Sequence, residues 1–147
     1  MDTVKLREQL VIDEGQVNEI YLDHLGYPTF GIGHLVLDTD PEFEQEVGTP
    51  VSEERVIETF EWDLLNVIGD CEICFESWED YPEEAKQVFA NMMFNMGRTR
   101  LSKFKKMIAA AEAGDWQEAA VQGRDSRWHK QVTNRAERLM VRLEAIV

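Results

Sequence analysis

Residues 12–34 read IDEGQVNEIYLDHLGYPTFGIGH and place two acids and a threonine close to a glycine-rich segment. Glu14 ends an amphipathic stretch, Asp23 follows nine residues later in a polar turn, and Thr29 follows six residues after that. The glycines and β-branched residues of 27–35 predict a small hairpin or a three-stranded sheet. A helix-end acid and a turn acid beside such a hairpin can face each other across one cleft. Cleavage of a glycosidic bond needs two carboxyl groups placed in this way.

The chain on either side of this segment is predicted to be largely helical. A helix over residues 4–13 is stopped by Gly15, and a short helix is expected over 41–47, starting at Pro41. Residues 52–79 predict the longest helix, because apolar side chains recur there at steps of three and four. At 1.5 Å per residue this helix would be about 40 Å long, too long for one compact lobe.

The long helix is therefore read as a spine between two lobes of a single domain that spans residues 1–147. Lobe 1 takes approximately residues 12–60, the spine approximately 52–79, and lobe 2 approximately 80–147 together with the N-terminal helix. Further helices are expected over 85–95, from Ser102 to Gly114, over 115–122, and after caps at Ser126 and at Thr133 or Asn134. The predicted fold class is α+β, mostly helical, with a short antiparallel sheet in the small N-terminal lobe and a helical C-terminal lobe.

Charge is distributed unevenly along the chain. The net charge is −14, with −18 in residues 1–80 and +4 in residues 81–147. An acidic first half argues against sequence-independent DNA binding, so no nucleic-acid partner is expected. The alternating acids of 38–46 lack the turn glycine and the spacing of a calcium loop, and a solvated acidic surface is the favoured interpretation over a cation site. No cofactor and no metal ion are predicted.

Two other sequence features limit the class of protein. Cys71 and Cys74 form a lone C-x-x-C without a second ligand pair, so they are read as small, partly buried thiols rather than as a zinc or redox site. No run of 18 apolar residues exists, which predicts no membrane insertion. The N-terminus carries charges inside its apolar stretch and does not resemble a secretory signal. Accumulation in the cytoplasm of the cell that makes it is therefore expected.

Several motifs, in the same order along the chain, resemble the T-even phage lysozymes, a family that cleaves bacterial peptidoglycan. The matching segments are IDEG (12–15), YLDHLGYPTFGIGH (21–34), FEWD (60–63), NMMFNMG (91–97), GDWQEAA (114–120) and SRWHKQVTNRAER (126–138). The spacing of Glu14, Asp23 and Thr29 matches the catalytic Glu-x8-Asp-x5-Thr arrangement of that family. The chain differs from many members in being strongly acidic and in having a C-terminus that we read as shorter than in the best-known ones.

The resemblance implies roles for individual residues. It assigns Glu14 as general acid, Asp23 as second catalytic acid and Thr29 as the threonine that helps to hold the hydrolytic water. It also implies that Arg135 pairs with Glu14. Taken singly, the first three residues are better explained as an exposed helix-end acid, a turn former and an ordinary strand residue. Taken together with Arg135 and the matching segments, they favour the functional interpretation.

Further residues have more ordinary interpretations. The resemblance implies that His34 and Asp63 form a structural ion pair. Lys103, Lys105 and Lys106 could grip an anionic wall, although a solvated helix face is favoured. The four tryptophans, Trp62, Trp78, Trp116 and Trp128, are expected in the core rather than as sugar platforms. No substrate-binding residue is assigned.

The function implied by the resemblance is that of an endolysin muramidase. Such an enzyme hydrolyses the β-1,4 bond between N-acetylmuramic acid and N-acetylglucosamine, with inversion, and lyses the host cell. The expected partners are peptidoglycan as substrate and a holin-type helper that gives a monomeric enzyme access to the wall and periplasm. The alternative is a lysozyme-fold module that holds wall glycan but cleaves it weakly or not at all.

Overall fold

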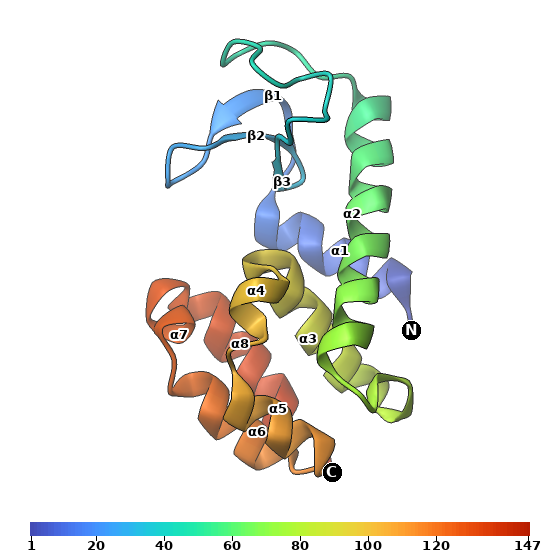
Figure 1. Ribbon diagram of the computed structural model, residues 1–147, viewed down its shortest axis with the longest axis vertical. Coiled ribbons are helices and arrows are strands. Elements are labelled where there is room, and N and C mark those ends of the chain that lie inside the picture. The colour runs from blue at the N-terminus through green and yellow to red at the C-terminus, as the bar shows by residue number, and fades with distance from the viewer. The chain divides into compact units, whose positions relative to one another are not determined.

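The computed structural model describes residues 1–147 and is 61% helical, with a small three-stranded antiparallel sheet (Figure 1). The predicted α+β, mostly helical, lysozyme-like class is thereby confirmed. The chain divides into two compact units, residues 7–65 and residues 1–6 with 66–147. The elements are α1 (Thr3–Glu14), β1 (Val17–Leu22), β2 (Pro28–Gly31), β3 (His34–Leu35), α2 (Glu53–Cys74), η1 (Trp78–Asp80), α3 (Glu83–Met96), α4 (Arg98–Leu101), α5 (Lys105–Glu112), α6 (Trp116–Arg124), α7 (Arg127–Gln131) and α8 (Thr133–Glu144).

The sheet in the unit of residues 7–65 has the order β1-β2-β3, with both neighbouring pairs antiparallel. Tyr21 lies opposite Thr29 in β1 and β2, and Phe30 lies opposite His34 in β2 and β3. Ile20 and Phe30 are fully buried, so this face of the sheet forms the core of the unit. The register therefore places Tyr21 and Thr29 side by side on the same face of the sheet, since directly opposed residues point to the same side.

Residues 36–52 connect β3 to α2 without a helix, so the predicted helix over 41–47 is wrong. Within residues 37–46 the backbone bonds are short-range turns, such as Phe43 N–H to the Asp40 carbonyl at 3.1 Å, whereas Gly48 and Val51 donate to Ile20 and Asn18 of β1. Glu44 adopts a positive φ of 67°, which a right-handed helix excludes. The side chain of Glu42 is also drawn inward to Arg55, with an Oε2···Nε distance of 3.0 Å. These contacts hold the segment in turns.

Helix α2 begins where the sequence predicts and ends earlier. The Ser52 hydroxyl accepts the Arg55 N–H at 3.1 Å and so caps the first turn. The expected end at residue 79 is wrong, because α-helix stops at Cys74. The Glu112 carboxylate accepts the Ser77 N–H at 3.2 Å, and a separate 3-10 turn, η1, follows. The 22 residues of α2 correspond to a length of about 33 Å rather than 40 Å.

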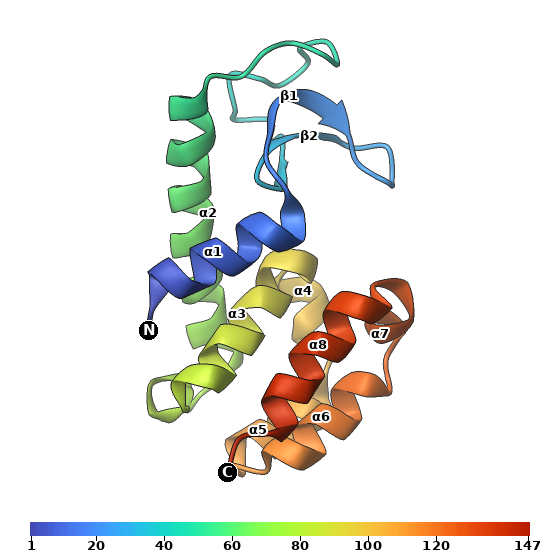
Figure 2. The same ribbon diagram turned by 180° about the vertical axis from the view of Figure 1, so that it is seen from behind.

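Helix α3 is the centre of the helical unit. Nine of its fourteen residues are buried, which fits its nearly continuous apolar sequence. Helix α8 contacts both α3 and α6, and these helices lie side by side in Figure 2. Aromatic rings extend the core, with Phe75 stacked on Phe89 at a centroid distance of 4.4 Å and Tyr81 edge-on to Trp116 at 5.1 Å. These residues come from segments far apart in sequence and join them into one core.

The helix boundaries after residue 97 follow the sequence only in part. Ser126 caps α7 by accepting the His129 N–H at 3.2 Å, as predicted. The predicted helix from Ser102 to Gly114 starts later than expected, as α5 at Lys105, and Ser102 is instead the C-cap of the short helix α4, which the sequence did not predict. Helix α8 starts at Thr133 with Val132 in the N-cap position and no side-chain cap, so the expected cap at Thr133 or Asn134 is wrong. Its stability comes from packing, since Ala136, Leu139, Met140 and Leu143 are buried.

The two cysteines are free. Cys71 is buried, and this burial raises the pKa of its thiol far above the usual range, which makes it unreactive. None of the helices combines the length and the apolar character that a membrane crossing requires.

Two helical glycines provide a matched test of the packing. A Cβ added at Gly123 would overlap the Sδ atom of buried Met140, whereas a Cβ at Gly69 would meet nothing within 4 Å. We expect Gly123→Ala to lower the free energy of unfolding by about 1–3 kcal/mol through overpacking. Gly69→Ala should raise it by about 0.5–1 kcal/mol through helix propensity. Urea unfolding of both variants measures the difference, and equal stability would show that Met140 adapts at no cost.

Candidate active site

Glu14 is the last residue of α1, and its carboxylate lies against the turn between β2 and β3. Gly15, with φ of +73°, ends the helix directly after it. A Cβ added at Gly33 would stand only 2.7 Å from Glu14 Oε2. Gly33 also has a φ of +64°, a conformation that glycine adopts most easily. The missing side chain at Gly33 therefore makes room for the Glu14 carboxylate.

Asp23 organises the turn between β1 and β2. Its Oδ1 atom accepts the Leu25 and Tyr27 N–H groups, both at 2.9 Å. The backbone N–H of Asp23 also donates to the Tyr27 carbonyl at 2.9 Å. Both side-chain bonds end on Oδ1, so the carboxylate is fixed in orientation while Oδ2 keeps its acceptor capacity.

Thr29 lies in β2, and its side chain is only 3% exposed. The hydroxyl donates to the Tyr27 carbonyl at 3.0 Å. Its single hydrogen is thus used within the protein, while the oxygen can still accept one from a bound molecule. Asp23 and Thr29 are held by the same residue, Tyr27, so the turn fixes both side chains together.

Tyr21 is a residue of this site that the sequence reasoning missed. It stands opposite Thr29 in the sheet, and its ring is half-buried. Burial raises the pKa of Tyr21 above its usual value, and the negative charges of Glu14 and Asp23 raise it further. Both acids therefore lie within electrostatic reach of one hydroxyl. A period-2 reading of β1 would have placed Tyr21 and Asp23 on the same side, and it is the signal that could have found Tyr21.

Arg135 lies in α8, in the other compact unit. Its Nε atom donates to Asn91 Oδ1 at 2.9 Å, which ties α8 to α3. The implied pairing of Arg135 with Glu14 stays a prediction.

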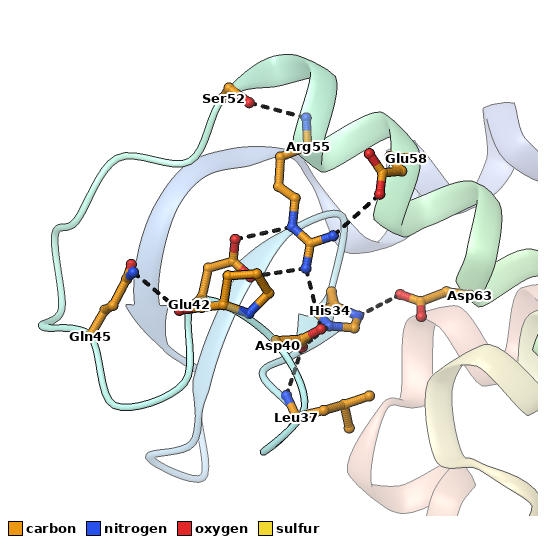
Figure 3. A network of polar contacts seen from close by, with 10 residues as sticks. His34, Leu37, Asp40, Glu42, Gln45, Ser52, Arg55, Glu58 and Asp63 are labelled. Atoms are coloured by element: carbon orange, nitrogen blue, oxygen red, sulfur yellow. Dashed lines mark hydrogen bonds and ion pairs between the residues drawn. The ribbon is translucent and has the colours of Figure 1, made fainter.

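His34 and Asp63 are in contact, with His34 Nδ1 and Asp63 Oδ2 2.7 Å apart. The structure adds a second acid to this pair, since His34 Nε2 lies 2.7 Å from Asp40 Oδ2. Arg55 continues the network, with Nη2 3.3 Å from Asp40 Oδ1 and 3.0 Å from Glu42 Oε1 (Figure 3). The network links β3, the segment 36–52 and α2 within one compact unit.

This network corrects the interpretation of the acidic run 38–46. Asp38, Glu44 and Glu46 are exposed, as a solvated surface would be. Glu42 is only 8% exposed, and Asp40 is shielded by His34 and Arg55. For Asp40 and Glu42 the prediction of a solvated surface is therefore wrong. Buried carboxylates need partners, and the bonds to these two cations supply them.

The acids also change the protonation of His34. Burial alone would lower the pKa of His34, but the hydrogen bonds and charges of Asp63 and Asp40 outweigh burial and raise it above 6.5. Burial alone would raise the pKa of Asp40, whereas the bonds from His34 and the Leu37 N–H and the charge of Arg55 lower it below 3.8. The charged forms of both groups are thus favoured in the folded protein.

The remaining candidate residues belong to the helical unit or are exposed on the surface. Lys103, Lys105 and Lys106 are exposed and line a pocket of about 460 Å³ in the helical unit. Three of the tryptophans are buried as expected, but Trp62 is 66% exposed, so its predicted place in the core is wrong. No group of three or more His, Cys, Asp or Glu residues is arranged to hold a metal ion.

Comparison of the sequence with known proteins identifies its family. The model of the family described as Phage lysozyme matches residues 12–145. The chain belongs to the phage lysozyme family. The motif resemblance is therefore confirmed.

Individual relatives differ in how much of their length is matched. The chain is 30% identical to Probable T4-type lysozyme 2 of Dictyostelium discoideum, over 92% of this chain and 91% of that protein. It is 28% identical to Probable T4-type lysozyme 1 of the same organism, over 95% and 93%. It is 31% identical to the pre-baseplate central spike protein Gp5 of Enterobacteria phage T4, over 92% of this chain but only 27% of that protein.

The His34 network predicts a pH-dependent stability. The contribution of His34 is fully present below its unfolded pKa of 6.5 and is lost as the pH rises through its higher folded pKa. The contribution of Asp40 is present above 3.8 and is lost as the pH falls through its lower folded pKa. We therefore expect His34→Asn to lower the melting temperature more at about pH 5.5 than at about pH 9. Equal losses at both values would contradict a charged His34.

Proposed function

We propose that this phage lysozyme family member is a peptidoglycan muramidase that cleaves the β-1,4 bond between N-acetylmuramic acid and N-acetylglucosamine. The observation that carries the proposal is the local geometry of residues 14–33, in which the Glu14 carboxylate lies against Gly33 and one residue, Tyr27, holds both Asp23 and Thr29. Membership of the family and likeness to proteins named T4-type lysozyme support it.

In this proposal Glu14 is the general acid. Its protonated carboxyl gives a proton to the glycosidic oxygen as the bond to the sugar C1 breaks. The close approach to Gly33 restricts where the carboxyl group can lie, so the proton is delivered from a defined position. Glu14 is left as a carboxylate after this transfer, and it takes up a proton from solvent at the end of the cycle.

Asp23 and Thr29 act on the attacking water and on the developing positive charge. The ionised Asp23 stabilises the oxocarbenium-like transition state and orients the water, whose oxygen bonds to C1 as one of its protons passes to the Asp23 carboxylate. Thr29 holds the same water by accepting one of its hydrogens, because its own hydrogen is committed to the Tyr27 carbonyl. A water that attacks from the face opposite the leaving group inverts the configuration at C1.

The biological setting proposed is host cell lysis by an endolysin. The enzyme would be made in the host cytoplasm, act as a monomer and reach the wall after a holin-type factor has permeabilised the membrane. Its substrate would be the peptidoglycan glycan strand.

The proposal is tested by replacing the general acid. Glu14→Gln keeps the shape of the side chain but cannot supply a proton, so it should abolish the release of reducing ends from purified peptidoglycan while leaving the fold intact. Glu8→Gln changes an exposed acid on the same helix and should leave activity unchanged. Turbidity of permeabilised bacteria and soluble product are measured together. A wild-type protein that binds peptidoglycan without releasing product would instead identify a glycan-binding module.

The charge of the chain predicts an unusual salt dependence. Residues 7–65 carry fifteen acids and two arginines, and the bacterial wall is also anionic. Repulsion extends about 30 Å at 0.01 M salt and about 8 Å at 0.15 M. We therefore expect the initial lysis rate to rise, or at least not to fall, between these two NaCl concentrations. A steep fall would show that the basic residues of 81–147 govern the approach to the wall.

A further inference from the structure

A second pocket, of about 330 Å³, lies within the unit of residues 7–65. Its volume falls in the range of about 300–1,000 Å³ that is typical of small-molecule sites. Arg55, Thr59 and Trp62 line it from α2, at positions i, i+4 and i+7, so they share one helix face. None of Glu14, Asp23 or Thr29 lines the pocket. It is therefore a place distinct from the candidate active site.

Trp62 gives this pocket an aromatic wall. Its exposure of 66% contrasts with 3%, 8% and 3% for Trp78, Trp116 and Trp128. A single exposed apolar side chain is ordinary on a protein surface, but this one lines a concave site. Leu37, which is 52% exposed, lines the same pocket. An indole ring offers a flat apolar face together with an N–H donor at its edge.

Thr59 adds an unsatisfied polar group. Its side chain is 5% exposed, and its Oγ1 atom is buried without a hydrogen-bond partner. A buried hydroxyl without a partner is unfavourable, and threonine in a helix has two accessible χ1 rotamers. Rotation about χ1 can therefore bring the hydroxyl to a ligand that supplies the missing bond.

The charges around the pocket favour an uncharged ligand. Asp40 is neutralised by His34 and Arg55, and Arg55 is bound by Glu42 and by Glu58, whose Oε1 lies 3.6 Å from Nη1 (Figure 3). The cations are thus already engaged, and an anionic ligand would meet an acidic unit. Glu58 is largely exposed and keeps acceptor capacity for hydroxyl or amide hydrogens.

We propose that this pocket binds an uncharged N-acetylhexosamine ring of a glycan strand, at a site separate from the candidate active site. The apolar face of the sugar ring stacks on Trp62, while its hydroxyl and acetamido groups bond to Glu58 and Thr59. The choice of this sugar rests on the proposed function, because the glycan of peptidoglycan supplies such rings. A second contact of this kind would hold the enzyme on the polymer between cleavage events.

The exposure of Trp62 provides a selective probe. Acrylamide is uncharged and quenches exposed tryptophans by collision, so it reports on Trp62 while the three buried tryptophans contribute little. The ligand is the β-1,4-linked tetramer of N-acetylglucosamine, and the Glu14→Gln background prevents its cleavage. We expect saturable protection of Trp62 from acrylamide. Calorimetry in the same background should show about tenfold weaker binding after Trp62→Ala, the loss expected for an aromatic anchor.

Matched variants separate the pocket from the surface of the helix. Leu65→Ala removes an apolar side chain of similar exposure, 65%, from the same helix outside the pocket and should leave affinity unchanged. Thr59→Val keeps the side-chain shape, removes the hydroxyl and should weaken binding. Three results would overturn the site: no binding of the tetramer, binding that leaves Trp62 fully quenchable, or equal affinity in the Trp62→Ala variant.

The outcome is also separable from the proposed function. Release of product from peptidoglycan is measured with native Glu14, independently of Trp62 protection. An inactive protein with a protected Trp62 would contradict the muramidase proposal and keep the sugar site. An active enzyme with an unprotected Trp62 would support the muramidase proposal and overturn the sugar site.

Discussion

The ion network centred on His34 and Arg55 is the constraint on which the unit of residues 7–65 depends. This segment contains fifteen acids and only two arginines, so few cations are available to neutralise carboxylates that folding brings inward. Arg7 is paired with Glu61, which leaves Arg55 as the remaining arginine. Protonated His34 provides one further cation and contacts two carboxylates at 2.7 Å. The turns of residues 36–52 follow from these contacts, because Asp40 and Glu42 must reach the two cations.

The same network lies beside the candidate active site in the sequence. Residues 31–34, GIGH, end β2 and begin β3. Gly33 receives the Glu14 carboxylate against its backbone, while the next residue, His34, is held by Asp63 and Asp40. The Phe30 ring contacts the His34 ring at a centroid distance of 5.0 Å, and its centroid lies 5.8 Å from the Arg55 guanidinium carbon. A turn fixed on one side by ion pairs can therefore present a fixed surface to the Glu14 carboxylate on the other.

Local chemistry explains which elements the sequence predicted well. Gly15 and Gly33 have positive φ values, and buried apolar residues recur at steps of three and four along α2 as far as Cys71. The order helix, sheet, helix could therefore be predicted from the sequence. The spacing of Glu14 and Asp23 could be read as well, since it needs only sequence positions. The end of α2 could not be predicted, because the segment that follows it is held by a distant residue. Glu112, 35 positions after Ser77, accepts the Ser77 N–H.

Tertiary partners also explain the errors at polar and aromatic positions. In the sequence, the alternating acids of 38–46 resemble a solvated surface. Only the structure shows that Arg55, thirteen residues after Glu42, binds the Glu42 carboxylate. Trp62 falls two residues after buried Phe60 on α2 and therefore faces away from the core, a position that a strict helical reading could have shown. Tyr21 could have been aligned with Asp23 by a period-2 reading, but its place opposite Thr29 depends on the strand register, which the sequence does not give.

The distribution of charge has a consequence for how such a protein can recognise an anionic polymer. Long-range electrostatics oppose the encounter, but at physiological salt their range falls to about 8 Å. Recognition must then come from contacts that do not depend on net charge, such as stacking and hydrogen bonds with neutral sugar rings. The exposed ring of Trp62 and the unpartnered hydroxyl of Thr59 can make contacts of this short-range kind. An acidic surface raises solubility and weakens non-specific attraction to the wall, so these local contacts would decide where on the glycan the protein stays.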